Sequence, residues 1–458
     1  MTLLPNSPHA RDIKSHVHPQ TNLKRHQEVG PTIMTRGEGV YVFDDAGKRY
    51  IEGVAGLWCA SLGFSVERLA KAAYDQMLRL GYYHTYRHHS SEAAIELAER
   101  LLAIAPVPMS KVLFQCSGSE ANDTAIKLVW YYHNAIGKSE KSKIIARKFA
   151  YHGNTAATVS LSGKADMHRD FNLPFAPFRH TDFPHYYRCG EAGESEEAFA
   201  SRCADNLEKL IQAEGPDTVA AFFAEPVMGA GGGIVPPRTY FEKVQKVLRK
   251  YDVLFIADEV ICGFGRTGNM WGSQTFNLRP DMISCAKALS AAFQPISALM
   301  INDKIYAAMV DQSDKLGSFA HGYTYAGHPV AAAVALEAQK IYAEADIVGH
   351  VRRVAPRMKE RLEAFAGHPL IGDVGGVGLL WALEIVKDKR TREPFDPGLK
   401  LGQTVGDHAR RHGLIARVIG DRLVFAPPLI ISEDEIDALA SALGKALDDT
   451  LKDIRRAA

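Results

Sequence analysis

Long apolar runs are missing from the sequence. No stretch of about 18 uncharged apolar residues occurs, so no segment is predicted to cross a membrane as a helix. The N-terminal stretch lacks the apolar centre and small-residue cleavage site of a secretory signal. An excess of one charge is also missing, because 54 Lys and Arg residues balance 53 Asp and Glu residues. We therefore expect a cytoplasmic protein whose partner is a small molecule, with no nucleic-acid or membrane partner.

Paired cysteines are missing as well. The cysteines are scattered, and no two of them form a C-x-x-C pair. Several lie in apolar runs, where a reduced cysteine acts as a small hydrophobic residue. This pattern fits a reducing compartment and argues against structural zinc, so no metal site is expected. The six residues are Cys59, Cys116, Cys189, Cys203, Cys262 and Cys285.

The middle of the chain alternates between strand and helix patterns. Short apolar runs are typical of buried parallel strands, and amphipathic segments such as 121–136 and 238–250 indicate helices between them. The prediction is an α/β fold with a mostly parallel sheet, whose ligands lie beyond the carboxyl ends of the strands. The predicted strands are 111–116, 143–147, 219–225, 253–258 and 282–286.

The two ends of the chain differ from the middle. Residues 32–52 indicate a hairpin that turns at Asp45–Gly47, and further strands are predicted near 378–386 and 414–426. With 458 residues, of which 46% are hydrophobic, the chain is long enough for two domains. We expect one smaller α+β domain built from both ends (1–64 and 329–458) and a large domain between them (65–328).

A candidate phosphate site follows the strand at 111–116. In KVLFQCSGSEANDTA, the strand leads through Gly118 and Ser119 into a helix, whose first N–H groups and dipole attract anions. The alternative is that Ser119 only caps the helix. The motif therefore suggests a phosphate site without establishing it.

An acid and a lysine end two later strands. Asp258 closes the run VLFIAD, and a buried carboxylate there implies a cationic partner such as a protonated pyridine nitrogen. Lys287 follows MISCA, where desolvation lowers the pKa of an amine and makes it nucleophilic toward aldehydes. The alternatives are a solvated strand-end carboxylate and a lysine that reaches solvent. Together with a phosphate site, the two residues match the requirements of pyridoxal phosphate (PLP).

Longer motifs strengthen this interpretation. They are SGSEAND (117–123), YHG (151–153), AEPVMGAGG (224–232), FIADEVICGFGRTG (255–268), AKAL (286–289) and HGYTYAGHPVAAA (321–333). Their combination resembles the class III aminotransferases, from about residue 30 to the C-terminus. GLWCASLGF (56–64) and APPL (426–429) are similar to segments of the amine or omega-amino acid:pyruvate transaminases. The resemblance implies PLP fold type I and a homodimer with shared active sites, which could pair into a tetramer.

The resemblance also assigns roles within the cofactor site. Lys287 matches the lysine that holds PLP as an imine, Asp258 the partner of the pyridine nitrogen, and Gly118 and Ser119 the phosphate loop. The remaining matched residues are Tyr151, stacked on one face of the ring, Val260 on the other face, Thr324, which reaches the phosphate of the neighbouring subunit, and His152 and Glu225 in the cofactor site.

Substrate residues follow from the same resemblance. Trp58, Tyr86, Tyr151 and Ala230 match positions that line the pocket, and Arg417 matches a mobile arginine that pairs with the carboxylate of the oxo-acid. The alternatives are a surface arginine, and core or dimer contacts for Trp58 and Tyr86. Relatives that use 2-oxoglutarate commonly have a glutamate where this chain has Ala230, so pyruvate is the expected acceptor. The segment AKALSAAFQP (286–295) lacks the glycines that relatives often have after the lysine.

Other functions stay open at this stage. They are a class III aminotransferase that uses 2-oxoglutarate, a related PLP decarboxylase or aminomutase, and a non-catalytic relative that only binds. A metal hydrolase would use His84, His88 and His89, but no acidic ligands accompany them, and interface packing explains these histidines better.

Overall fold

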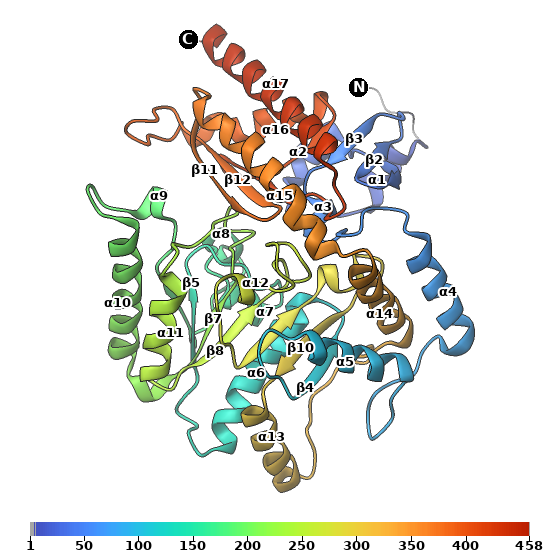
Figure 1. The fold of residues 1–458 in the computed structure, drawn as a ribbon, viewed down its shortest axis with the longest axis vertical. Coiled ribbons are helices and arrows are strands. Elements are labelled where there is room, and N and C mark those ends of the chain that lie inside the picture. The colour runs from blue at the N-terminus through green and yellow to red at the C-terminus, as the bar shows by residue number, and fades with distance from the viewer. Residues whose placement is uncertain (1–3, 5, 458) are drawn as a thin grey trace.

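The computed structural model describes residues 4 and 6–457, and its centre is a seven-stranded sheet (Figure 1). The strand order is β4-β10-β9-β8-β7-β5-β6. Strand β10 runs antiparallel to both of its neighbours, whereas the pairs from β9 to β6 are parallel. The strands are β4 (Lys111–Gln115), β5 (Lys143–Arg147), β6 (Phe178–Thr181), β7 (Val219–Ala224), β8 (Leu254–Asp258), β9 (Met282–Cys285) and β10 (Ser297–Ile301).

The predicted fold class is confirmed by this sheet. All five predicted strands are present, with ends that differ by at most one residue from the expected ones. Two strands were not predicted. Strand β6 has the largely polar sequence FRHT, so it lacks the apolar pattern of a buried strand. Strand β10 pairs antiparallel with both neighbours, so it does not continue the β-α order of the parallel strands.

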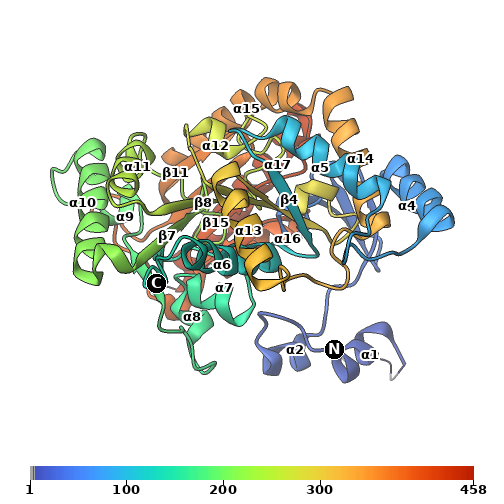
Figure 2. The same ribbon diagram turned by 90° about the horizontal axis from the view of Figure 1, so that it is seen from below.

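Helices cover both faces of the sheet because successive side chains of a strand point to opposite faces. Phe222 of β7 packs into one cluster with helices α10 (Glu196–Glu214) and α11 (Tyr240–Lys250). Phe223 packs into another with α6 (Gly118–Ala135), α7 (Ala156–Leu161) and α13 (Asp303–Leu316). Figure 2 shows the two helix layers on either side of the sheet.

The two ends of the chain meet through their strands. Strand β13 (Leu414–Ile415) pairs in parallel with β3 (Arg49–Glu52) in the sheet β1-β2-β3-β13. The expected hairpin joins β2 (Tyr41–Asp44) to β3, where the N–H of Gly47 donates to the carbonyl of Asp44. The region 414–426, where strands were expected, forms β13, β14 (Arg417–Ile419) and β15 (Arg422–Phe425). The other strands are β1 (Met34–Glu38), β11 (Ile371–Val377) and β12 (Leu380–Ile385).

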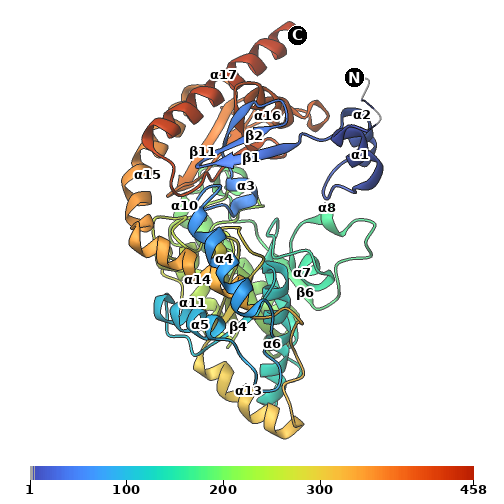
Figure 3. The same cartoon turned by 90° about the vertical axis from the view of Figure 1, so that its right-hand side faces the viewer.

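Helices α1 (Pro8–Ser15) and α2 (Leu23–Val29) stand off the body of the molecule (Figures 2 and 3). Within residues 4 and 6–457, no helix is both long and apolar enough to cross a membrane. The other α-helices are α3 (Ala55–Trp58), α4 (Glu67–Leu80), α5 (Glu92–Ile104), α8 (Ala165–His168), α9 (Tyr186–Cys189), α12 (Gly272–Thr275), α14 (Pro329–Glu344), α15 (Ile347–Glu363), α16 (Leu401–Arg411) and α17 (Glu433–Ala457).

Candidate active site

A cavity of about 380 Å³ opens beyond the carboxyl ends of β4, β8 and β9. This is the edge where an α/β sheet places its ligands. Eight residues predicted for the cofactor site line the cavity, although they come from five separate segments. They are Gly118, Ser119, Tyr151, His152, Glu225, Asp258, Val260 and Lys287.

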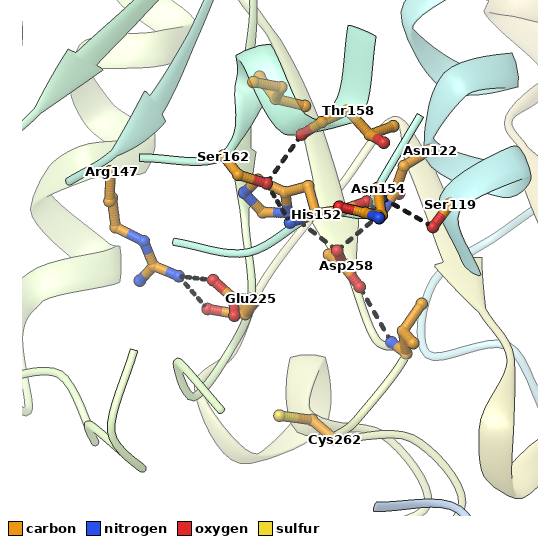
Figure 4. Close-up of polar contacts among 12 residues, drawn as sticks. Ser119, Asn122, Arg147, His152, Asn154, Thr158, Ser162, Glu225, Asp258 and Cys262 are labelled. Carbon is orange, nitrogen blue, oxygen red and sulfur yellow. Dashed lines mark hydrogen bonds and ion pairs between the residues drawn. The ribbon is translucent and has the colours of Figure 1, made fainter. Parts of the chain in front are cut away.

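The loop before α6 forms one wall. Ser117, not Ser119, caps the helix, because its Oγ accepts the N–H of Glu120 at 3.2 Å. The alternative role of Ser119 as a cap is therefore wrong. Ser119 Oγ instead accepts the N–H of Asn154 at 3.0 Å (Figure 4). A Cβ added at Gly118 would lie 3.1 Å from both methyl groups of Val260, so the loop packs closely against the segment that follows β8.

Asp258 lies at the centre of a buried hydrogen-bond network (Figure 4). Its Oδ2 accepts from Asn122 Nδ2 and from His152 Nδ1, both at 2.8 Å, and its Oδ1 accepts the N–H of Val260 at 3.1 Å. Since a carboxylate can only accept, the contact places the proton of neutral His152 on Nδ1. These donors partly compensate the buried negative charge, which still lacks a cationic partner of fixed charge within the described residues.

Lys287 lies two residues after the end of β9, at a backbone φ of +49°. A non-glycine residue rarely adopts this left-handed conformation, and such strain is frequent at functional sites. Burial lowers the pKa of the Lys287 amine, while the charge of Asp258 acts in the opposite direction. Desolvation thus increases the fraction of neutral, nucleophilic amine. The glycine-poor segment 286–295 has the same kind of backbone strain further along. Ala291 and Ala292 also have positive φ values, of +50° and +72°.

Glu225 is the least satisfied group in the cavity wall. Its carboxylate lies 3.5 Å from Arg147 Nη2, but neither carboxylate oxygen accepts a hydrogen bond from the described residues. Burial raises its pKa to about 7 despite the nearby positive charges. Burial also raises the pKa of the Tyr151 hydroxyl, and the charge of Asp258 adds to this shift. The Glu225 carboxyl is therefore expected to be largely protonated in slightly acidic solution. The Tyr151 hydroxyl is expected to stay protonated at neutral pH as well.

Apart from Tyr151, the predicted substrate residues lie outside this lining, and so does Thr324, which was predicted to reach the phosphate. Trp58 is buried in an apolar cluster with Val227 and Cys262, and Ala230 is half-buried in the loop after β7. Tyr86 is 42% exposed, and Thr324 is exposed with its carbonyl accepting the Tyr82 hydroxyl at 2.8 Å. A single chain therefore does not bring these residues together around the cavity.

Arg417 lies on strand β14 and is half-buried, not on an exposed loop. No carboxylate of residues 4 and 6–457 lies within ion-pair distance of its guanidinium, although many other arginines are paired. Neighbouring Arg422, for example, bonds Glu384 and the carbonyl of Gly232. Arg417 is thus a cation that the described part of the chain leaves open to a ligand.

Two of the three histidines of the hydrolase alternative, His84 and His89, lie among aromatic rings, and His88 is exposed. The ring of His84 stacks on Tyr83 at 4.8 Å and meets His89 edge to face at the same distance. None of His84, His88 and His89 belongs to a group of potential metal ligands in the described residues. The aromatic contacts agree with a packing role.

Sequence reasoning missed several lining residues. Asn122 holds Asp258, and it lies four positions after Gly118, on the same face of α6; this spacing could have revealed it. Leu57, Cys59, Cys116 and Gln294 also line the cavity. Cys116 lies in the expected strand region, but Leu57 and Cys59 come from the N-terminal segment, and only the tertiary structure brings them here.

The cavity fits PLP. It combines a desolvated lysine, a buried carboxylate that lacks a fixed cationic partner, and the N-terminus of a long helix beside a serine. Buried acceptor or donor atoms without partners, namely Asn122 Oδ1, His152 Nε2 and the Glu225 carboxylate, also lie around it. A polar, anionic, aromatic cofactor is the kind of ligand that this set accommodates.

The chain belongs to the class-III aminotransferases, whose family model matches residues 23–447. It is therefore an enzyme of the PLP-dependent aminotransferases, of PLP fold type I.

Individual relatives agree with this assignment. A rice (Oryza sativa subsp. indica) protein named probable gamma-aminobutyrate transaminase 2, mitochondrial, is 52% identical over 92% of this chain and 85% of its own length. The omega transaminase from Pseudomonas jessenii in complex with PMP is 52% identical, with a TM-score of 0.96 over 97% of this chain and 98% of its own. A structure described as a transaminase with L-alanine is also 52% identical, with a TM-score of 0.91 over 92% and 100%.

Proposed function

We propose that this enzyme transfers an amino group from a primary amine or omega-amino acid to pyruvate, which gives alanine and an aldehyde or ketone. The observation that carries this proposal is the half-buried guanidinium of Arg417, which pairs with no carboxylate of residues 4 and 6–457, together with an alanine in place of an acid at position 230. Its planar fork suits the carboxylate of a small oxo-acid. An acidic residue at position 230 would compete for the arginine, and this chain has none there.

The residues of the cavity divide the chemistry among them. PLP, when bound, supplies a carbonyl that condenses with amines and a ring that accepts electrons from the reacting carbon. In our proposal Lys287 holds the cofactor, and its freed amine then moves a proton to and from the substrate carbon. Asp258, held by Asn122 and His152, keeps the ring nitrogen protonated. Gly118, Ser119 and Thr324 of a second subunit hold the phosphate.

The donor and acceptor classes have separate support. Gamma-aminobutyrate, named for the rice relative, is an omega-amino acid, and L-alanine, named for a solved relative, is the amino form of pyruvate. Trp58, Tyr86 and Tyr151 would then contact the substituents of the donor. A 2-oxoglutarate-dependent enzyme is the second candidate, since the carboxylate of that acid also matches Arg417. A PLP decarboxylase or aminomutase has no comparable support.

The acceptor is tested by half-reactions on the PLP-loaded enzyme. Gamma-aminobutyrate or a carboxylate-free amine should convert the visible absorbance of the bound cofactor to that of its amino form, without oxo-acid present. Pyruvate should then restore the first spectrum at least tenfold faster than an equal concentration of 2-oxoglutarate. Faster recovery with 2-oxoglutarate would overturn the pyruvate assignment, and release of CO₂ would indicate decarboxylation.

We also propose a cytoplasmic homodimer with the domain boundaries expected from the sequence. Helix α4 has exposed apolar side chains at Tyr74, Met77 and Leu78, with exposed fractions of 63%, 55% and 73%. An apolar surface of this kind is typical of a subunit interface. Light scattering should give twice the chain mass, and four times this mass would indicate a tetramer. Activity regained on mixing inactive Lys287→Ala and Thr324→Ala subunits would support shared sites.

A further inference from the structure

We propose that Asp12, His16 and His18 bind one divalent transition metal ion of the zinc type, with His26 supporting the carboxylate. These residues belong to the N-terminal segment 8–29, which stands off the body and takes no part in the cofactor cavity (Figure 3). The absence of cysteine pairs argues against a thiolate site, but it does not bear on histidine and aspartate ligands.

The ligand atoms already converge. His16 Nδ1 lies 3.3 Å from Asp12 Oδ1, and His18 Nε2 lies 2.8 Å from Asp12 Oδ2. All three ligand atoms lie within 4.8 Å of one another. Bonds of about 2.0–2.1 Å to zinc place tetrahedral ligands roughly 3.3 Å apart. Small side-chain rotations would therefore create the site, and a water molecule would fill the fourth position.

Charge favours a cation at this point. The carboxylate of Asp12 pairs only with imidazoles. No lysine or arginine of residues 4 and 6–457 lies within ion-pair distance of it, although the same segment contains Arg11, Lys14, Lys24 and Arg25. One carboxylate and two neutral imidazoles are a preferred ligand set for zinc and its neighbours in the transition series.

A second histidine-carboxylate group in the molecule provides a contrast. His185, Asp373 and Glu384 also lie close enough together to hold a metal. There, however, Arg422 pairs with both carboxylates and Arg188 also pairs with Glu384. These guanidinium groups already supply the positive charge and would repel a metal ion. The N-terminal cluster has no such occupant.

The metal would stabilise a segment that packs poorly. No side chain of α1 is buried, and His26 is the buried residue of α2. Isolated helices of seven or eight residues are marginal in water. His26 Nε2 lies 3.1 Å from Asp12 Oδ2, and its ring lies 4.1 Å from that of His18. A metal on Asp12, His16 and His18, with His26 bonded to the same carboxylate, would connect the two helices.

Equilibrium dialysis of the PLP-loaded enzyme against zinc chloride tests the site. We expect one zinc per subunit, at least tenfold weaker binding in Asp12→Asn and in the double variant His16→Ala/His18→Ala, and wild-type binding in His9→Ala. His9 is the matched control, because it lies on the same helix but pairs with Asp45. Since PLP itself can bind metals, the visible spectrum of the cofactor should stay unchanged. No binding at tens of micromolar zinc, or equal binding in all variants, overturns the proposal.

Limited trypsin digestion gives an independent readout of the segment. Arg11, Lys14, Lys24 and Arg25 are cleavage sites within it. Zinc should slow cleavage at these sites severalfold in the wild type and in His9→Ala, and should have no effect in the double variant. Equal protection of the double variant would contradict the proposal, because a general effect of zinc on trypsin or on the enzyme would explain it.

Discussion

The cofactor end and the substrate end of the site are built differently. The predicted residues at the cofactor end, apart from Thr324, line one cavity at the ends of buried strands. At the substrate end, Trp58, Tyr86, Ala230 and Arg417 come from a short helix, two loops and a short strand, and they do not line that cavity. Arg417 has no carboxylate partner among the described residues, whereas Asp258 has three hydrogen-bond donors.

This difference indicates that the cofactor end has a fixed geometry, whereas the substrate end can change its specificity. A sheet edge fixes backbone positions, so groups that must meet one cofactor in one geometry belong there. Loops and subunit contacts tolerate change, so groups that select among substrates belong on them. Substitutions at the cofactor end should therefore abolish chemistry, whereas those at the substrate end should change specificity.

The largest effect is expected for Lys287→Ala. Loss of the amine should reduce transamination by about 10⁴-fold or more, because no other group supplies both attachment and proton transfer. Rapid-mixing absorbance with an amine donor measures this rate. The matched control is Lys141→Met, since Lys141 also has a pKa lowered by burial but only donates to the carbonyls of Tyr251 and Asp252. An active Lys287→Ala enzyme would contradict the assignment.

Asp258→Asn should have the next largest effect, a rate loss of about 10²-fold or more, because the ring nitrogen loses its buried counter-charge. The half-reaction with a saturating amine measures it. Asp281→Asn changes the same charge at the opposite edge of the sheet, where Asp281 accepts the N–H of Phe255. That control should keep near wild-type turnover, and equal losses in both variants would point to a structural effect.

Arg417→Leu should change specificity. The KM for pyruvate should rise about 10- to 100-fold, as expected for loss of a charge-assisted hydrogen bond. The half-reaction with an amine that has no carboxylate should stay unchanged, as should both reactions in the exposed control Arg411→Leu. Equal losses in the two half-reactions would remove the contrast between the ends of the site.

Glu225→Gln should change pH dependence. The raised pKa of Glu225 means that the native state retains a proton between the ordinary value of 4.5 and about 7, which the unfolded chain releases. Wild-type stability is therefore lost as pH rises through this window, and the variant should gain about 1–3 kcal/mol relative to wild type between pH 5 and 8. Urea unfolding at a series of pH values measures how the free energy of unfolding changes with pH. Arg147 does not contribute to this change, because arginine stays charged throughout.

A control of opposite sign is Glu214→Gln. Arg179 and Lys143 lower the pKa of Glu214, so its contribution is present at neutral pH and is lost as pH falls below the ordinary value. This variant should lose stability relative to wild type as pH rises from 3 to 6. The same slope in both variants would contradict the assigned environment of Glu225.

The smallest effect is expected for Ala292→Gly. Glycine would relieve the left-handed strain at φ +72°, but it also adds entropy to the unfolded chain. The net gain should be about 1 kcal/mol or less, measured as the midpoint of urea unfolding. The control is Ala288→Gly, because Ala288 lies nearby and has no positive φ. This substitution should be destabilising. A clear loss in Ala292→Gly would show that the residue is not strained.

Sequence patterns determined the fold class and much of the cofactor site. Buried strands such as β7 and β8 are continuous apolar runs, and a chemical group at the end of each is visible in the sequence, as at Asp258 and Lys287. The edge strand β6 was missed because its sequence is largely polar. Strand β10 is an apolar run, but it follows β9 without an α-helix between them and so does not continue the β-α alternation.

Only the tertiary structure decided which distant groups meet. Asn122 and His152 reach Asp258 from 136 and 106 positions away, and Asp12 meets three histidines through a turn between two short helices. The tertiary structure also left Arg417 without an acidic partner in the described part of the chain, and it placed the Glu225 carboxylate 3.5 Å from Arg147. Periodicity reports which face of an element is buried, but contacts between elements depend on how those faces pack, and packing is a property of the whole chain.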